Sequence, residues 1–391
     1  MGQNSSCSVC ANPTVITVVD FGVHPPANRF IAAESFEENQ ETYTLGLGFC
    51  SECKTMQLSH RMPMQAVKPR YEWLVYNEPE QHLDDVASQL CKLPGIGASS
   101  RMLGVTYKDQ STLDRLTKLG LLPSPCLSFD NFNIFRTPAV AVGVKAAYAP
   151  VELLLARHVI EHAVDAVGLI SELKELIVPG GYLVFELPDS EKVLRAGNHA
   201  FIWEEHISYF TEHSLPILAE KVGAKLVWSA RYSYNYEDSL VAAFQFTSEQ
   251  PCAMDSATSA DRDVNGLLQQ FNQGLATAKL EWRELLQNYR DQGCKLAVFG
   301  AGHLAVKWIN FLGLSDLVDC VIDDNAHKAG MYMPGSKLPI LPSSALKDRE
   351  IKVCISTLSP ESEQKVRQKL CSYFEEGGIF IPAFKIAGQG L

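Results

Sequence analysis

The sequence predicts an α/β protein made of a small N-terminal block and two larger α/β units. Two observations support this prediction. The first block contains two C-x-x-C pairs, Cys7 with Cys10 and Cys50 with Cys53, among short alternating segments and many turn-forming residues. Beyond it, two series of short apolar runs of strand type alternate with helical patterns, which is the order of elements in doubly wound sheets.

Length and composition indicate a globular protein with more than one core. The chain has 391 residues, 46% hydrophobic and 20% charged, so two or three domains are expected. A formal net charge of -11 without a clustered basic face argues against a nucleic-acid partner and favours a small-molecule one. The apolar runs are too short to span a bilayer, and no apolar signal segment opens the chain. We therefore expect a cytoplasmic protein without a membrane partner.

The first predicted domain, residues 1–70, is too small to fold on an apolar core alone. Four thiolates at the spacing of Cys7, Cys10, Cys50 and Cys53 can surround Zn²⁺ as a tetrahedron, with Zn–S bonds of ~2.3 Å. Chance spacing and two redox dithiols are the alternatives, but redox C-x-x-C pairs normally lie where a strand runs into a helix. The pattern therefore predicts structural zinc, and four protein ligands leave that metal no open position for catalysis.

A core domain is predicted over residues 71–250. Its strand-like runs are Leu153–Leu155, Tyr182–Leu187 and Leu240–Phe246, and a helical pattern covers Val167–Ile177. Pro179–Gly181 ends this helix and precedes a buried strand. Class I methyltransferases have such a helix, turn and strand just beyond their cofactor site, and the segment resembles theirs. Any α/β domain can also use this turn, because proline fixes φ and glycine tolerates positive φ.

Residues 251–290 are predicted to form a helical linker, and residues 291–391 a second α/β domain of Rossmann type. The linker contains one long amphipathic helix over Leu267–Tyr289. In the last domain a strand is followed by Gly300-Ala301-Gly302 and a helical pattern, with Asp323 about twenty residues further on. These glycines would let a phosphate approach a helix N-terminus, although one such motif is weak evidence for a dinucleotide.

Several motifs together resemble one family, the sugar C-methyltransferases. They are the paired cysteines, Phe21–Asn28 (FGVHPPAN), Trp203–Thr211 (WEEHISYFT), and Asp323–Asn325 followed by Met333–Gly335. The resemblance covers nearly the whole chain. It implies a zinc-binding N-terminal domain, a class I methyltransferase-like Rossmann core that uses S-adenosylmethionine, and a C-terminal Rossmann-like domain that helps to hold a nucleotide-linked keto sugar.

The resemblance also implies a catalytic role for His206, because the histidine of the family's Glu-His-x-x-Tyr-Phe motif lies at the sugar. A base of near-neutral pKa suits proton abstraction from carbon beside a ketone, and the resulting enolate would attack the sulfonium methyl group. Glu205 and Tyr209 are expected to assist. The alternative is that His206 is a capping or core histidine. The expected substrate contacts are Tyr76, Asn77, Trp203, Gly300, Gly302, His303 and Asp323.

His158 and His162 lie four residues apart, a spacing at which two histidines can bind one metal ion. A zincin, however, has glutamate directly after the first histidine, and here Val159 follows. The segment comes after a predicted strand, where methyltransferases place a loop beside the cofactor. We therefore expect His162 to contact cofactor or substrate, with structural packing of both histidines as the alternative.

The predicted cofactor loop departs from the family. In the family it contains Gly-x-Asn-Asp-Gly, whose glycines let the backbone pass against the cofactor. The matching segment here is Thr106–Gln110, with threonine and glutamine in place of both glycines and only the aspartate retained. Gly95 and Gly97 are alternative loop glycines, and Leu127–Asp130 is the candidate acidic end of the second strand. The departure predicts weak S-adenosylmethionine binding. The expected cofactor contacts are Gly104, Tyr107, Lys108, Asp109 and His162.

These residues predict a C-methyltransferase-like enzyme that acts on a nucleotide-linked keto sugar by proton abstraction at carbon and methyl transfer. The altered loop leaves two alternatives. One is an isomerase-like enzyme on a similar carbonyl substrate that keeps the base and needs no methyl donor. The other is a non-catalytic protein that uses the altered site only for binding.

Overall fold

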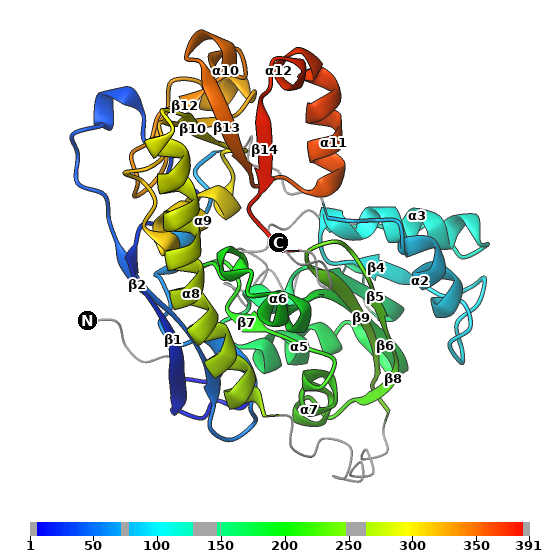
Figure 1. Cartoon of the computed structure of the whole chain (residues 1–391). Coiled ribbons are helices and arrows are strands. Elements are labelled where there is room, and N and C mark those ends of the chain that lie inside the picture. The colour runs from blue at the N-terminus through cyan, green and yellow to red at the C-terminus, as the bar shows by residue number, and fades with distance from the viewer. Residues whose placement is uncertain (1–5, 72–77, 128–146, 149, 248–262, 386–391) are drawn as a thin grey trace.

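The computed structural model describes residues 6–71, 78–127, 147–148, 150–247 and 263–385, and within them the chain forms three β-sheets (Figure 1). A four-stranded sheet belongs mainly to the N-terminal domain. Two five-stranded sheets organise the middle and C-terminal units. The predicted α/β class is confirmed: a small N-terminal domain precedes two α/β units, each organised by a five-stranded sheet.

The N-terminal sheet has the strand order β1-β2-β3-β7. Three strands, β1 (Val15–His24), β2 (Tyr43–Cys50) and β3 (Met56–Leu58), pair in an antiparallel manner. The fourth strand, β7 (Ser208–Tyr209), comes from the core and pairs with β3. The chain just beyond His206 is therefore anchored on the N-terminal domain. This domain also contains the short helices η1 (Ala33–Ser35) and α1 (Met64–Val67).

The core sheet has the order β4-β5-β6-β9-β8. Its parallel strands are β4 (Met102–Gly104), β5 (Val151–Arg157) and β6 (Ile177–Asp189), and β8 (Lys225–Tyr232) and β9 (Asp238–Gln245) follow as an antiparallel pair. The three predicted core strands lie largely within these elements. Helices pack on both faces of the sheet. Helices α2 (Leu83–Leu90) and α3 (Gln110–Lys118) cover one face, and η3 (Ile160–His162), α5 (Ala166–Lys174) and α7 (Ser214–Lys221) cover the other. The short helix η2 (Tyr107–Asp109) leads into α3, and α6 (Ser190–Ala196) and η4 (His199–Phe201) contribute Leu194 and Ala200 to a different apolar cluster.

The Pro179–Gly181 turn lies inside β6, although the sequence suggested that it precedes the strand. Val151 of β5 pairs with Ile177, but Leu153, two residues further on, pairs with Tyr182. Strand β6 therefore contains a bulge that includes this tripeptide. The middle residue of the tripeptide has a φ of 84°, which glycine adopts readily. The sequence located the turn correctly and placed the start of the strand too late.

The C-terminal sheet follows the long helix α8 (Val264–Asp291), yellow in Figure 1, which confirms the predicted long helix, whereas its role as a linker stays a prediction. All strands of this sheet are parallel, in the order β12-β11-β10-β13-β14. The strands are β10 (Lys295–Phe299), β11 (Cys320–Ile322), β12 (Ile340–Leu341), β13 (Ile351–Ser356) and β14 (Ile379–Pro382). The helices are α9 (His303–Leu312), η6 (Ala326–Lys328), α10 (Ala345–Asp348), α11 (Pro360–Lys369) and α12 (Cys371–Glu375).

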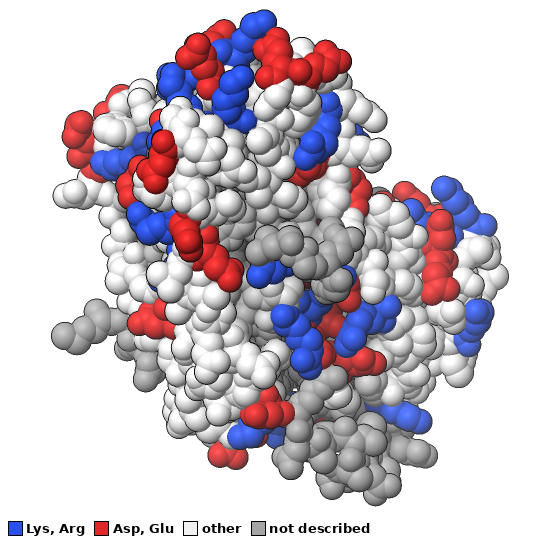
Figure 2. Space-filling model, in the orientation of Figure 1, with Lys and Arg blue, Asp and Glu red and all other residues white. Residues whose placement is uncertain are grey.

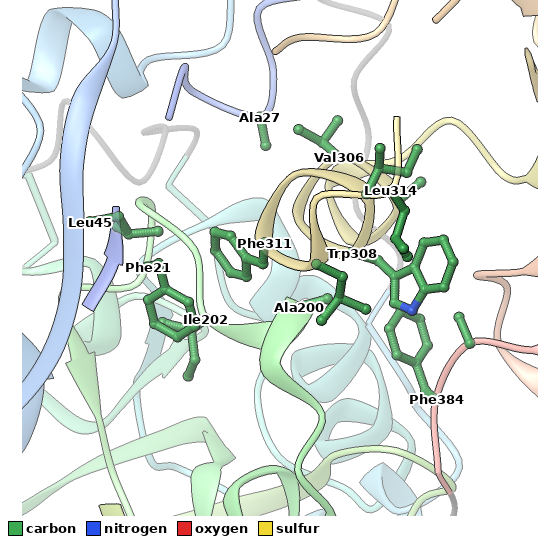
Figure 3. Close-up of a cluster of buried hydrophobic side chains, with 14 of the residues drawn as sticks. Phe21, Ala27, Leu45, Ala200, Ile202, Val306, Trp308, Phe311, Leu314 and Phe384 are labelled. Atoms are coloured by element: carbon green, nitrogen blue, oxygen red, sulfur yellow. The ribbon is translucent and has the colours of Figure 1, made fainter. Parts of the chain in front are cut away.

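The N-terminal and C-terminal domains share one apolar core, part of which Figure 3 shows. Helix α9 contributes Trp308 and Phe311 to it, and Phe311 stacks on Phe21 of β1 with ring centroids 4.3 Å apart. Each buried phenylalanine contributes about 1.5–3 kcal/mol relative to an exposed one. Helix α9 is therefore packed firmly against the N-terminal domain.

The predicted domain boundaries near residues 70, 250 and 290 stay predictions, and both β7 and the shared core connect units across them. None of the described helices combines the length and the apolar character that a bilayer crossing requires. On the face shown in Figure 2, the described acidic and basic side chains are interspersed.

Candidate functional site

The four cysteines of the N-terminal domain meet at one point. The sulfur atoms of Cys7 and Cys53 lie 3.5 Å apart, those of Cys10 and Cys50 lie 3.4 Å apart, and all four lie within 4.8 Å of one another. In a tetrahedral site with Zn–S bonds of ~2.3 Å, sulfur atoms are separated by ~3.8 Å. The four sulfurs therefore fit a zinc ion, and they would fill all its positions.

Both cysteine pairs are followed by the same turn. Ala11 and Lys54, the residues after each pair, have φ of 57° and 59°. Their N–H groups donate to the carbonyl oxygens of Cys7 and Cys50 at 3.0 and 3.1 Å. A residue with a Cβ loses about 1–2 kcal/mol in this left-handed conformation. Metal binding is the favourable term that can offset this cost, because metal affinity contributes directly to folding in so small a unit.

A cavity of about 1030 Å³ lies between the core and the C-terminal domain. Its wall includes residues at the carboxyl ends of β5 and β6, residues of η2, and the start of α9. Doubly wound sheets bind their ligands beyond the carboxyl ends of the parallel strands. The cavity therefore has the position expected for an active site. Seven predicted site residues line it: Tyr107, Lys108, His162, Trp203, Glu205, His206 and His303.

The N-terminal domain fixes the two glutamates of the WEEH segment. Asn28 Nδ2 donates to Glu205 Oε1 at 3.1 Å, and the Ala27 N–H donates to the Glu204 carboxylate. Glu204 also pairs with Lys307 of α9 at 2.5 Å, and both side chains are fully buried. The two family motifs, FGVHPPAN and WEEH, thus form one structural unit in which all three domains hold the chain next to His206.

Aromatic contacts hold the His206 ring at the cavity wall. It meets His162 edge-on with ring centroids 4.9 Å apart, and Trp203 at 5.2 Å. Trp203 in turn stacks on His303 of α9 at 4.1 Å. The Nδ1 atom of His162 lies 2.7 Å from the carbonyl oxygen of Glu205, to which it donates. Residues from the core and the C-terminal domain therefore fix this part of the wall.

His206 is neutral in this setting. Burial lowers its pKa well below the usual range, and the neighbouring histidines and Lys108 lower it further. Burial likewise lowers the pKa of His162. A neutral imidazole keeps one nitrogen lone pair, so each ring can accept a proton or bind a metal ion.

Tyr209 does not line the cavity. Its hydroxyl donates to the carbonyl oxygen of Trp203 at 3.1 Å and accepts from the Trp203 N–H at 2.9 Å. Burial raises its pKa well above the usual range. The geometry therefore gives this tyrosine a structural task, bracing the turn that carries His206, in place of the assisting role suggested by the motif.

Charged side chains fill the strand ends beside the cavity. Glu186 of β6 accepts from Arg157 Nε at 2.5 Å and from Ser239 Oγ at 2.7 Å, and His158 Nε2 lies 3.3 Å away. Burial alone would raise the pKa of Glu186, but the hydrogen bonds from His158 and His82 and the charge of Arg157 hold it well below the usual range. The carboxylate is therefore ionised at neutral pH.

His158 carries a positive charge in this network. Burial alone would lower its pKa, but Glu78, Glu161 and Glu186 raise it to about 10. Its φ is 52°, a strained value for a histidine, and such strain persists where surrounding contacts impose it. Lys108 pairs with Glu78 at 3.0 Å beside it. Two paired cations thus border the cavity.

Family models match both ends of the chain. Residues 7–67 match a zinc binding domain, and residues 253–384 match the C-methyltransferase C-terminal domain. The C-methyltransferase NovU of Streptomyces niveus is 20% identical over an alignment of 367 residues, and the match covers 85% of this chain and 84% of the relative. The chain is thus similar to the C-methyltransferases at both ends and over most of its length. The resemblance stated from the motifs is confirmed, as is the zinc-binding character of the four-cysteine domain.

Solved methyltransferase structures are similar to the chain only weakly. A 1,6-didemethyltoxoflavin-N1-methyltransferase from Burkholderia thailandensis is 12% identical, with 43% of this chain and 79% of that one covered and a TM-score of 0.32. The magnesium protoporphyrin IX methyltransferase of Synechocystis PCC 6803 is 11% identical, with 43% and 82% covered and a TM-score of 0.32. Scores of this size do not establish a shared fold.

The loop after β4 in this C-methyltransferase homologue adopts ordinary backbone angles. Thr106 has a φ of −135° and Gln110 a φ of −54°, so the two residues that replace glycines avoid positive φ. The Asp109 carboxylate accepts from the N–H groups of Thr106 and Arg157, both at 2.8 Å. Asp109 is fully buried, and burial raises its pKa to about 6. It braces the loop and does not reach the cavity.

Gly104 faces inward as well. A Cβ there would meet Asp109 Cβ and Cys126 Sγ, each at 2.8 Å, so the glycine permits close packing of the loop on β4. Gly95 and Gly97 lie ahead of β4 and do not line the cavity. These alternative glycines do not supply a cofactor loop.

A sulfonium donor fits this cavity only in part. The cavity has the expected position, and three of the expected cofactor contacts, Tyr107, Lys108 and His162, line it. The loop offers no glycine at the wall, however. The described residues therefore do not account for tight donor binding.

The glycine loop of the C-terminal domain is closed by its own residues. Asp323 Oδ2 accepts from the Ala301 N–H at 2.9 Å and from Lys328 Nζ at 2.8 Å. Asp323, Gly300 and Gly302 do not line the cavity, in contrast to the adjacent His303. Of the substrate contacts predicted in this domain, only His303, at the start of α9, lines the cavity.

Sequence reasoning missed the acidic wall of the cavity. Glu78, Glu161, Glu186 and Glu237 all line it, and burial raises the pKa of Glu237 to about 8. Only Glu186 offered a signal, as a charged residue inside the predicted strand Tyr182–Leu187. Tyr76 and Asn77, two further predicted substrate contacts, lie outside the described residues.

Proposed function

We propose that this C-methyltransferase homologue abstracts a proton from the carbon beside the ketone of a nucleotide-linked sugar, with His206 as the base. The observation that carries the proposal is the position of a neutral His206 imidazole on the wall of the large cavity between the core and the C-terminal domain. A base of this kind must be unprotonated and within reach of the substrate carbon. The buried WEEH segment provides the first property and the cavity the second.

The same charges that keep His206 neutral favour the product of proton abstraction. Removing the proton places negative charge on the ketone oxygen, and Lys108 and His158 border the cavity with positive charge. Fixed positive groups stabilise such an oxyanion more than they stabilise the neutral ketone. Glu205, held by Asn28, supports the segment that carries the base.

The start of α9 suits the phosphate groups of a sugar nucleotide. His303, the first residue of this ten-residue helix, lines the cavity and stacks on Trp203. The N-terminus of a helix favours anions, because its free N–H groups and the helix dipole both point at them. We assign the nucleotide end of the substrate to this side of the cavity.

S-adenosylmethionine, when bound, would supply the methyl group that the enolate carbon attacks. Of the residues expected to contact this donor, Tyr107, Lys108 and His162 line the cavity. The absence of loop glycines at the wall favours a second candidate, an isomerase-like enzyme that uses the same base and returns the proton to carbon without a donor.

Solvent deuterium incorporation into a panel of nucleoside-diphosphate keto sugars tests the proposal. We expect the wild-type protein to exchange the hydrogen on the carbon beside the ketone, and His206→Gln to slow exchange by ~10²-fold or more while sugar binding persists. His213→Gln, far from the cavity lining, serves as the matched control. Undiminished exchange in His206→Gln would remove the base from the mechanism. Binding without exchange in the wild type would favour the non-catalytic alternative.

A further inference from the structure

Three side chains that the motifs did not group together meet at the cavity wall. Glu161 and His162 belong to η3, and His206 comes from the WEEH segment. One potential ligand atom from each residue lies within 4.8 Å of the other two, and His162 Nε2 lies 3.9 Å from Glu161 Oε1. Small rotations of the side chains would bring these atoms to the separations found around a single ion.

Glu161 is the observation that points to a ligand. Its side chain is 2% exposed, yet neither carboxyl oxygen makes a hydrogen bond of normal geometry to any described residue. The nearest charged group is His158, whose Nδ1 lies 3.4 Å from Oε1. A buried carboxyl group without hydrogen bonds is costly, so such groups are normally paired or coordinate a metal.

His162 presents the correct nitrogen for coordination. Its Nδ1–H donates to the carbonyl oxygen of Glu205 at 2.7 Å, which leaves the lone pair on Nε2, the atom facing Glu161. Histidine ligands in metal sites characteristically donate their other N–H to a carbonyl or carboxylate, and ligating carboxylates are themselves contacted by neighbouring polar groups. His162 has the first feature, and His158 Nδ1, 3.4 Å from Oε1, is the polar neighbour of the Glu161 carboxylate.

The fixed cations nearby already have partners. Lys108 pairs with Glu78 at 3.0 Å, and Arg157 pairs with Glu186 at 2.5 Å. His158 is the one cation in direct contact with Glu161 in the described structure, and its charge is already balanced, since Glu78 and Glu186 also lie within 4.0 Å of its ring. The local charge therefore does not exclude a divalent ion.

We propose that Glu161, His162 and His206 form a second metal site, separate from the four-cysteine site, which binds a divalent first-row transition-metal ion. Two imidazoles and one carboxylate suit such ions, and three protein ligands leave open positions for water or a substrate oxygen. While the ion is bound, His206 cannot accept a proton. Occupation of this site therefore inhibits the proposed proton abstraction. This consequence rests on the proposed function, whereas the metal site itself does not.

Cobalt titration of the full-length protein, with zinc in its cysteine site, tests the second site. We expect one further Co²⁺ to bind, with weak visible absorption and without the intense charge-transfer bands that thiolate ligands give. His162→Gln and Glu161→Gln should each weaken this binding by at least ~100-fold, because each substitution removes one of the three protein ligands of the ion. His303→Gln, a histidine of the same cavity outside the cluster, should bind Co²⁺ like the wild type.

Two outcomes would overturn the proposal: no Co²⁺ binding beyond the cysteine site, or equal binding in all variants. Circular dichroism of each variant checks that it folds. The proposed function is tested separately, by deuterium exchange in chelator-treated protein that retains its zinc. Exchange without cobalt binding refutes the second site alone, and cobalt binding without exchange refutes the proposed base alone.

Discussion

Replacing His158 with glutamine tests the charge network at the strand ends. The ring nitrogens of His158 lie 3.3–3.9 Å from Glu186, Glu161 and Glu78, and these groups raise its pKa from 6.5 to about 10. A rise of this size corresponds to at most about 5 kcal/mol in favour of the protonated folded state. Breaking a buried ion pair by removing one partner costs ~3–5 kcal/mol. We expect His158→Gln to lower the free energy of unfolding near pH 6 by that amount.

The pH dependence of this loss has a defined sign. Because the pKa of His158 is higher in the folded than in the unfolded protein, the folded state binds more protons between pH 6.5 and about 10. Its contribution is complete below pH 6.5 and is lost as the pH rises towards 10, by up to ~1.4 kcal/mol per pH unit. The difference between wild type and His158→Gln should therefore shrink by ~3 kcal/mol between about pH 6.5 and 9.

Urea unfolding of the zinc-loaded proteins at several pH values in this range measures the difference. Groups that titrate in both proteins, such as the cysteine thiols, cancel in the comparison. His213→Gln provides the control, since His213 precedes α7 and has no carboxylate partner among the described residues. A difference that stays constant across the range would show that His158 is neutral in the folded protein and would refute the assigned network.

Four further outcomes follow from the structure. Cys50→Ser should lose its zinc and unfold the N-terminal domain, and elemental analysis that finds no metal in folded wild-type protein would contradict this. Lys54→Gly should stabilise the protein by ~1 kcal/mol in thermal unfolding, because glycine tolerates its φ of 59°; a lower melting temperature would argue against strain there. Glu205→Gln should slow deuterium exchange less than His206→Gln does, and an equal or larger loss would make Glu205 the better candidate base. Calorimetry with S-adenosylmethionine should show weak binding. Micromolar affinity would show that the loop Thr106–Gln110 still supports donor binding.

The regular elements of the fold were predictable from periodicity. The buried strands β5, β6 and β9 and the helices α5 and α8 are long and strongly patterned, so local sequence determines them. The two-residue strand β7 could not be predicted in this way. It exists because its partner β3 lies in another domain, and a pairing between distant segments leaves no local pattern.

The candidate site was predictable only where a motif marks it. The four cysteines follow from spacing alone, and His206 follows from the WEEH segment. Glu78 and Glu161 carry no motif, because their importance comes from the groups that fold around them. For the same reason the sequence assigned Asp109 to the cofactor, whereas the structure uses its carboxylate to brace the loop.

The proposed base and the proposed donor loop are held by different parts of the molecule, and this separation bears on the proposed function. The segment of His206 is fixed by Ala27, Asn28 and Lys307, from the N-terminal and C-terminal domains. The loop Thr106–Gln110 is fixed by contacts within the core, mainly through Asp109. Changes in the loop therefore need not disturb the base. Loss of affinity for the donor would therefore leave the proposed proton abstraction possible, and for that reason exchange and donor binding have to be measured separately.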